Sequence, residues 1–170
     1  LENYLKQLKL PTFVKEYKRT ARQCSQEKRG YEPFLQQLTE LEIQHRRIHT
    51  MQRRIKEASF PAEKELAEFD FTAIPTINKK RIIDLAKGDY IRKRECVVMI
   101  GQPGTGKTHL AVALGREACR QGKRVKFFTA TGLATAYAEA RDERTVQKLE
   151  RFIEQRDLII LDELGYIPLG

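Results

Sequence analysis

The stretch Gly101-Gln-Pro-Gly-Thr-Gly-Lys-Thr108 decides the fold, because it is a complete G-x-x-x-x-G-K-[ST] phosphate-binding loop. Its glycines let the backbone turn tightly with several amides on one side, and such a nest of N–H groups binds polyphosphate oxygens. Lys107 would reach the β- and γ-phosphates, and the Thr108 hydroxyl would be a ligand of Mg²⁺. The residues expected at the nucleotide are Gly101, Gln102, Pro103, Gly104, Thr105, Gly106, Lys107, Thr108 and His109.

The flanks of this loop have the pattern that a genuine phosphate site requires. Before it runs Cys96-Val-Val-Met-Ile100, a short apolar stretch typical of a buried parallel strand. After it, residues 109–121 are rich in Ala and Leu and predict a helix that stops at Gly122. The alternative is a glycine-rich turn that matches the motif by chance, and the strand, loop and helix in this order argue against it.

A second stretch, Leu158-Ile-Ile-Leu-Asp162-Glu163, predicts an apolar strand that ends in two carboxylates. Ligands of parallel sheets lie at the carboxyl ends of the strands, so Asp162 is expected beside the loop as a magnesium ligand. Glu163 would then deprotonate an attacking water, which makes Glu163 and Lys107 the expected catalytic residues. The alternative is that the two acids only end a strand. The pair favours ATP hydrolysis over phosphoryl transfer to a small substrate.

The composition describes a globular, basic protein. Of 170 residues 41% are hydrophobic, and the formal net charge of +9 predicts a polyanionic partner besides ATP. The excess is largest in residues 1–60, with 13 Lys and Arg against 7 Asp and Glu. Three cysteines without metal-ligand spacing, no signal peptide and no membrane-spanning apolar run predict a protein of the reducing cytoplasm. No Ser-His-Asp or Cys-His catalytic signature is apparent.

The N-terminal third predicts helices. Residues 1–23 have helical spacing, and Pro11 divides them into a short and a longer helix. A long amphipathic helix is expected from Tyr31 to Lys56. Its basic side chains lie seven residues apart in two ridges that could contact DNA phosphates, although a solvated charged face is the commoner meaning of this pattern. The candidate DNA-binding residues are Arg46, Arg47, Arg53 and Arg54.

The remaining chain predicts a linker and a P-loop core. Residues 60–77 contain two prolines and three phenylalanines, as in a linker packed on a domain. Strands alternate with helices in the rest, which predicts a parallel α/β sheet with helices on both faces. The elements expected there are a helix at 79–87 capped by Asn78, a strand at 124–129, helices at 131–141 and 143–156, and a strand at 158–161. The expected domains are 1–59, 60–77 and 78–170.

Several runs form a pattern across nearly the whole chain. They are Leu8-Lys-Leu-Pro11, Phe60-Pro-Ala, Phe69-Asp-Phe71, the loop with His109, Gly122-Lys-Arg-Val and, most specific, Leu161-Asp-Glu-Leu-Gly-Tyr-Ile-Pro-Leu169. Together they resemble the IstB-like transposition helper ATPases, relatives of the DnaC-type helicase loaders in the AAA+ class. The resemblance implies an ATP- and Mg²⁺-dependent homo-oligomer that assembles on duplex DNA, without marked sequence preference, and assists a transposase. It assigns Lys107, Thr108, Asp162 and Glu163 the roles given above.

Other interpretations remain open from the sequence. A helicase loader acting on single-stranded DNA would use the same motifs, a small-molecule kinase would use the loop without the acidic pair, and a nucleotide-binding switch would need no hydrolysis. The sensor residues and arginine finger of an AAA+ protein cannot be assigned before Gly170. We therefore expect that the C-terminal part of the ATPase domain is missing and that hydrolysis by this chain is weak or absent.

Overall fold

The computed structural model describes residues 1–164 and divides the chain into two compact units, one of residues 1–52 and one that begins at Arg53. The motif residues 165–169 lie outside the described part. The long helix α3 (Tyr31–Ala58) contributes to both units. Each unit is described by itself below. No helix in residues 1–164 is both long enough and apolar enough to cross a membrane.

The N-terminal unit is helical, as expected. Helix α1 (Glu2–Gln7) is followed by α2 (Pro11–Gln26), and Pro11 occupies the first turn of α2, where a missing N–H costs nothing. The helices bury Leu5, Cys24 and Leu38. The predicted division at Pro11 is confirmed, and α2 extends three residues beyond the expected end at residue 23.

A buried carboxylate connects α2 with α3 in this unit. Glu42 is only 4% exposed, and its Oε2 accepts the backbone N–H of Thr12 at 2.9 Å. Its Oε1 accepts from Arg46 Nε at 2.7 Å. Burial raises the pKa of Glu42, but the hydrogen bonds from Arg46 and Thr12 outweigh it and lower the pKa. Glu42 thus caps the N-terminus of α2, because the side chain of the N-cap residue Leu10 has no atom that can accept a hydrogen bond.

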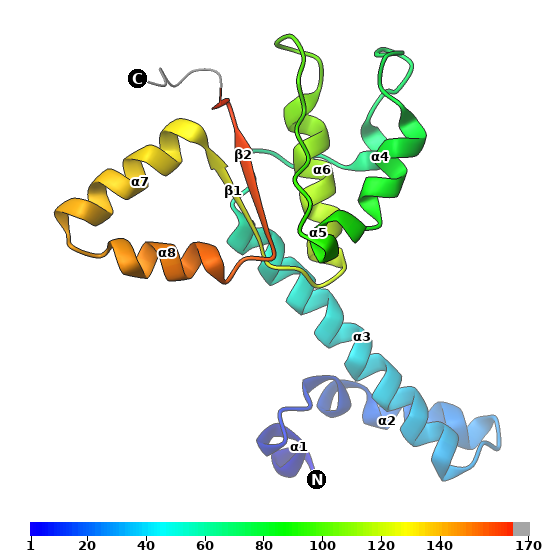
Figure 1. The fold of residues 1–170 in the computed structure, drawn as a ribbon. Coiled ribbons are helices and arrows are strands. Elements are labelled where there is room, and N and C mark those ends of the chain that lie inside the picture. Colours follow the sequence, from blue (N-terminus) through cyan, green and yellow to red (C-terminus); the bar gives the residue numbers. More distant parts are fainter. Residues whose placement is uncertain (165–170) are drawn as a thin grey trace. The chain divides into compact units, whose positions relative to one another are not determined.

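The second unit is built on a parallel pair of strands. Strand β1 (Val125–Thr129) pairs with β2 (Leu158–Asp162) in a register that sets Val125 beside Leu158 and Thr129 beside Asp162. Figure 1 shows α6 on one side of the pair and α7 with α8 on the other. The helices of this unit are α4 (Lys79–Ala86), α5 (Asp89–Lys93), α6 (Lys107–Arg120), α7 (Ala130–Asp142) and α8 (Val146–Glu154), with the short 3₁₀ helix η1 (Leu66–Glu68).

The core of this unit forms around α6. Ala118 and Cys119 pack with Ala58 and Val125, and burial raises the pKa of the Cys119 thiol to about 11. A Cβ at Gly115 would lie 2.6 Å from Ile160 Cδ1 and 2.8 Å from Phe60 Cε1. A larger residue at this position would require the side chains of Ile160 and Phe60 to shift.

The helix signals of this unit are largely confirmed. The Asn78 side chain accepts the N–H of Arg81 at 3.1 Å, as the capping prediction requires. The α6 helix ends before Gly122, whose φ is +85°. Helix α8 begins at Val146 rather than at the expected residue 143, because Arg144 has a left-handed φ of +56° and ends α7 in a turn.

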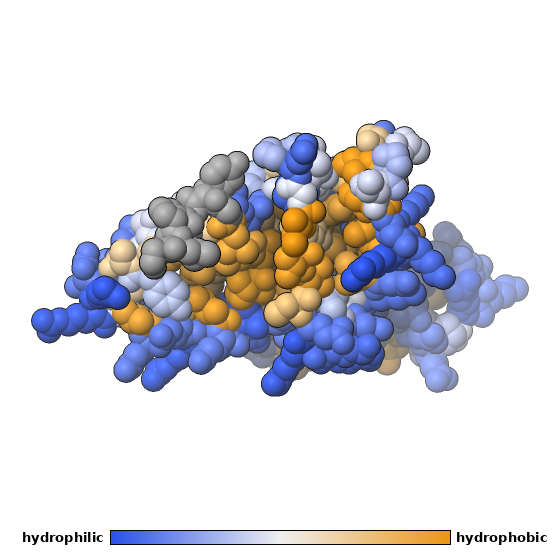
Figure 2. Space-filling view, turned by 45° about the horizontal axis from the view of Figure 1, so that its top comes forward, coloured by the Kyte–Doolittle hydropathy of each residue, from blue (hydrophilic) through white to orange (hydrophobic). Residues whose placement is uncertain are grey.

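The prediction of a buried strand over Cys96–Ile100 is wrong for this structure. The segment has no regular secondary structure, and the exposed fractions of Val98 and Ile100 are 76% and 93%. Only Met99 packs against the core. Figure 2 shows apolar residues at the surface in the middle of that view. A strand needs a neighbour for its backbone groups, and within residues 1–164 the only ladder is that between β1 and β2.

Candidate nucleotide-binding site

The phosphate loop leads directly into α6. Gly104 and Gly106 have left-handed φ angles of +78° and +75°, and α6 begins at Lys107. The first helical hydrogen bond runs from the N–H of Leu110 to the carbonyl of Gly106, at 2.9 Å. The amides of Lys107, Thr108 and His109 therefore precede the hydrogen-bonded turns. They form the positive end of the helix, which is suited to bind an anion.

The ring of Phe69 packs against the phosphate loop at Gly106. A Cβ at Gly106 would lie 2.6 Å from Cε2 of the Phe69 ring, so only glycine fits at this point. The Phe69 ring also packs edge-on against His109, with the ring centroids 5.2 Å apart. The loop conformation thus depends on a residue that lies more than thirty positions earlier in the chain.

The side chain of Lys107 lies against the first residues of the loop. Its Nζ donates to the carbonyl oxygens of Gly101 and Gln102, at 2.7 Å each. Thr105 Oγ1 also donates to the Gln102 carbonyl, at 2.8 Å. The ammonium group is therefore held at the loop by acceptors that phosphate oxygens could replace.

The structure brings Thr108 and Asp162 into contact. Thr108 Oγ1 donates to Asp162 Oδ2 at 2.6 Å, across 54 positions of sequence. Asp162 is the last residue of β2, and its Oδ1 accepts the N–H of Glu163 at 2.9 Å. The two facing oxygens are hard ligands of the kind that Mg²⁺ prefers, so this pair fits the ion. Glu163 follows with a left-handed φ of +62° and is exposed.

His109, expected at the nucleotide, makes its described contacts elsewhere. Its Nε2 lies 3.0 Å from the carbonyl oxygen of Glu65, and its ring packs on Phe69. Both partners belong to the segment 60–77. The His109 ring therefore joins this segment to the first turn of α6 rather than facing the loop residues.

Sequence reasoning missed an ion-pair cluster between Glu65 and the C-terminal half of α6. Glu65 accepts from Arg116 at 2.6 Å and from Arg120 at 2.5 Å, and these arginines lie four residues apart on α6. Burial raises the pKa of Glu65, but the hydrogen bonds and charges of Arg120 and Arg116 outweigh it and lower the pKa. The one available signal was the spacing of the two arginines, which does not identify their partner.

The four candidate DNA-binding arginines of α3 do not form one accessible surface. Arg46 is paired with Glu42 and donates to the Lys9 carbonyl at 2.5 Å, and Arg53 lies 3.8 Å from Glu57. Arg54 is half-buried, and its Nη1 has no hydrogen-bond partner within residues 1–164. Only Arg47 is exposed and takes part in none of the ion pairs found in that range.

A glycine loop at the start of a helix, with an acidic strand end beside it, is the arrangement of a P-loop ATPase domain. The family model described as IstB-like ATP binding protein matches residues 3–170, and the chain belongs to this family. The resemblance found in the sequence is thereby confirmed.

Three relatives show how far the similarity extends. The chain is 33% identical over 99% of its length to "Insertion sequence IS5376 putative ATP-binding protein" of Geobacillus stearothermophilus, and covers 67% of that protein. It is also 33% identical to "Insertion sequence IS21 putative ATP-binding protein" of Pseudomonas aeruginosa and to "Insertion sequence IS232 putative ATP-binding protein" of Bacillus thuringiensis, covering 64% and 54% of them. The chain thus spans about two thirds of the relatives it matches over its full length. All three belong to insertion sequences, which does not favour the helicase-loader alternative.

Proposed function

We propose that this chain binds ATP with Mg²⁺ as part of an AAA+ helper of transposition, and that its site is built for ATP hydrolysis, which we expect to be weak or absent in this chain. The observation that supports this most directly is the 2.6 Å contact between Thr108 Oγ1 and Asp162 Oδ2 at the start of α6. A kinase for a small substrate needs no second carboxylate at this position, whereas a hydrolase needs a group that activates water. Glu163 is the residue adjacent to Asp162.

Each residue of the site has a defined role in this proposal. The amides at the start of α6 bind phosphate oxygens, and Lys107 exchanges the carbonyls of Gly101 and Gln102 for the β- and γ-phosphates. Thr108 and Asp162 would hold Mg²⁺, and the ion would supply positive charge against the phosphates. Glu163 accepts a proton from the water whose oxygen attacks the γ-phosphorus. The bond from that phosphorus to the β–γ bridging oxygen breaks, and ADP and phosphate result.

The wider role rests on the family and on charge. We propose that ATP held between copies of the chain stabilises a homo-oligomer on duplex DNA, and that this assembly assists the transposase of the same element. The relatives named for insertion sequences and the net charge of +9 support this proposal. Sequence preference is not expected, because no element for reading base edges was identified. We propose the cytoplasm as its location, in line with free thiols at Cys24, Cys96 and Cys119.

A division of the chain into three parts belongs to this proposal. We propose residues 1–59 as a helical subdomain, 60–77 as a linker packed on the ATPase core, and 78–170 as that core. The packing of Phe60 against Gly115 and of Phe69 against Gly106 supports the assignment of the linker. The cluster of Glu65 with Arg116 and Arg120 supports it as well.

The chemical part is tested by separating binding from hydrolysis. Binding of a fluorescent ATP analogue and release of phosphate are measured for the wild type, Lys107→Ala and Glu163→Gln. We expect Lys107→Ala to weaken binding, and Glu163→Gln to keep binding while the slow release of phosphate stops. The exposed Glu150 supplies a matched control in Glu150→Gln, which should behave as the wild type. Unchanged phosphate release by Glu163→Gln would refute the assignment of the base.

The DNA part is tested by fluorescence anisotropy with duplex and single-stranded DNA of equal length, with and without ATP. We expect salt-sensitive binding to duplex that ATP strengthens in the wild type but not in Lys107→Ala. A preference for single strands would instead support a helicase loader. DNA affinity that responds to neither ATP nor salt would exclude the proposed assembly.

A further inference from the structure

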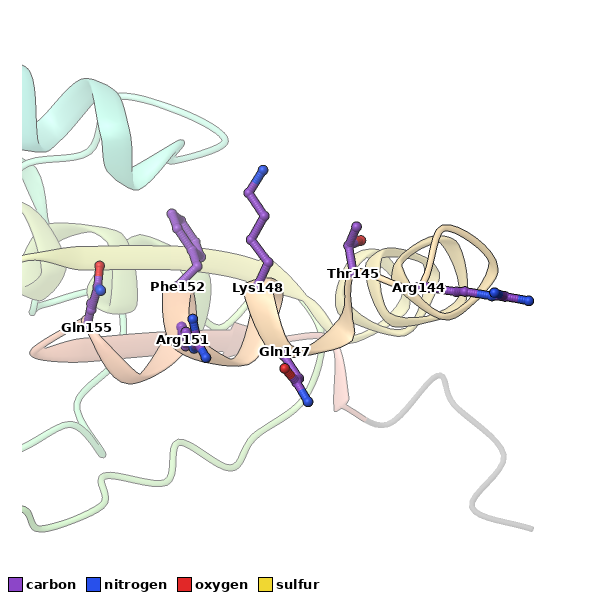
Figure 3. Close-up of a pocket in the computed structure, with 7 residues that line it drawn as sticks. All are labelled: Arg144, Thr145, Gln147, Lys148, Arg151, Phe152 and Gln155. Carbon is purple, nitrogen blue, oxygen red and sulfur yellow. The ribbon is translucent and has the colours of Figure 1, made fainter.

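Three cations line a shallow pocket beside α8. Lys148 and Arg151 lie three residues apart on α8, and Arg144 lies in the turn before it; these three residues, here named the α8 stripe, line the pocket with Phe152 and Gln155. Figure 3 shows Lys148, Phe152 and Gln155 projecting from the same side of the helix. At a rise of about 1.5 Å per residue, Lys148 and Arg151 lie about 4.5 Å apart along the axis of α8.

The cations of the stripe form no ion pair with any residue that the structure describes, residues 1–164, and all three side chains are exposed. Of the arginines that the sequence suggested, Arg46 and Arg53 are paired with glutamates. On α8 the like charges of Lys148 and Arg151, three residues apart, destabilise the helix by about 0.2–0.5 kcal/mol. An external anion would remove this repulsion.

The apolar side of α8 is half-buried, and the stripe is exposed to solvent. Val146, Leu149 and Ile153 are half-buried and lie on the side of the helix opposite to the stripe. Phe152 borders the stripe, 37% exposed, with the Arg156 guanidinium 4.2 Å from its ring centroid. Arg156 also lowers the pKa of Lys126, although burial is the larger cause. The surface therefore combines a row of cations with an accessible aromatic ring.

We propose that the α8 stripe binds the sugar-phosphate backbone of DNA. Three point charges in a row match a linear polyanion better than a single phosphate group, and Phe152 offers a flat apolar contact to a sugar or a base. None of these groups reads base edges in a defined pattern, so the contact is independent of sequence. The inference rests on the proposed function, in which DNA is the partner, and it replaces α3 by α8 as the contact surface.

The size of the effect follows from counterion release. Each phosphate contact contributes about −0.9 to the slope of log K against log salt concentration, so losing three contacts should reduce the slope by about 2.7. At about 0.15 M salt the same relation gives roughly fivefold weaker binding per contact, and on the order of a hundredfold for all three.

The test compares two triple variants of equal charge. Arg144→Gln, Lys148→Gln and Arg151→Gln are combined in one variant of the full chain. Lys15→Gln, Arg22→Gln and Lys28→Gln, which change exposed residues outside the ion pairs found in the N-terminal unit, are combined in the control. Anisotropy of a labelled duplex and a labelled single strand is measured over a salt series. Binding of the ATP analogue is measured in parallel, as a check on folding.

We expect the stripe variant to lose DNA affinity and salt slope as calculated, while the control variant and ATP binding change little. Duplex binding that is unchanged in the stripe variant, or weakened equally in the control, overturns the inference and leaves the proposed function standing. Loss of DNA binding in the single variant Arg47→Gln would place the DNA contact on α3 and would also overturn the inference. If the wild type prefers single-stranded DNA and the stripe variant loses this binding, the stripe is the DNA contact, but duplex DNA is refuted as the partner in the proposed function. A wild type that binds neither probe refutes both.

Discussion

Replacing Gly106 by alanine should destabilise the protein more than the same change at Gly104. The two glycines have φ angles of +75° and +78°, so the backbone strain of an alanine is nearly the same at both. Their surroundings differ, because no atom of residues 1–164 lies within 4 Å of a Cβ at Gly104, whereas a Cβ at Gly106 meets Phe69 at 2.6 Å. The comparison therefore isolates the contact between the loop and the segment 60–77.

The magnitudes follow from these two effects. A left-handed alanine costs about 1–2 kcal/mol, and the more restricted unfolded chain returns about 0.4–1 kcal/mol, so Gly104→Ala should cost about 1 kcal/mol. Overpacking against Phe69 adds about 1–3 kcal/mol at Gly106. Urea unfolding followed by circular dichroism measures both. In a Phe69→Ala background the cost of Gly106→Ala should fall to that of Gly104→Ala. Equal costs of the two alanines in the wild-type background, or a cost at Gly106 that Phe69→Ala does not change, would refute the reasoning.

Two further predictions concern carboxylates held by arginines. Arg46→Gln should destabilise the N-terminal unit by about 1–3 kcal/mol, because Glu42 stays buried with one charged partner fewer. The control Arg47→Gln, at an exposed position, should change the free energy of unfolding in urea by less than about 0.5 kcal/mol. Similar values for both variants would contradict the structural role of Arg46. The folded-state pKa of Glu65 is lowered, so its contribution is fully present above its ordinary pKa of 4.5 and is lost as the pH falls through the lower folded value. Thermal melts over this acidic range should show less pH dependence in Glu65→Gln than in the wild type and in the exposed control Glu63→Gln, and identical pH dependence in all three would refute the assignment.

Local signals predicted much of this molecule. The loop motif, Pro11 and the cap at Asn78 each act within a few residues, and the structure follows them. The parallel strand pairing that brings Asp162 beside Thr108 could also be predicted from the sequence. In an α/β pattern, an apolar run that ends in an acid indicates a buried strand with a ligand-binding residue at its carboxyl end.

The missed features depend on distant partners. Glu65 meets Arg116 across 51 positions, and Glu42 meets the backbone of Thr12 across 30. A single sequence places an isolated glutamate on the solvent side of a helix, because burying an unpaired charge is costly. Only the fold shows that a partner is present. The sequence likewise shows the charges of Arg46 and Arg53 but not their pairing with Glu42 and Glu57, and DNA binding by the arginines of α3 stays a prediction.

The segment Cys96–Ile100 presents the sharpest difference between sequence and structure, and one substitution decides it. The sequence predicts that Val98 lies in a buried strand, where a lysine would leave a charge without a partner and cost several kcal/mol. In the structure Val98 is 76% exposed, so Val98→Lys in the 170-residue chain should change the free energy of unfolding by less than about 0.5 kcal/mol. Met99→Lys is the matched contrast, because Met99 packs against the cluster of Ile82, Leu110 and Leu114. A large loss at Val98, equal to that at Met99, would show that the strand forms and that both faces of the segment are covered.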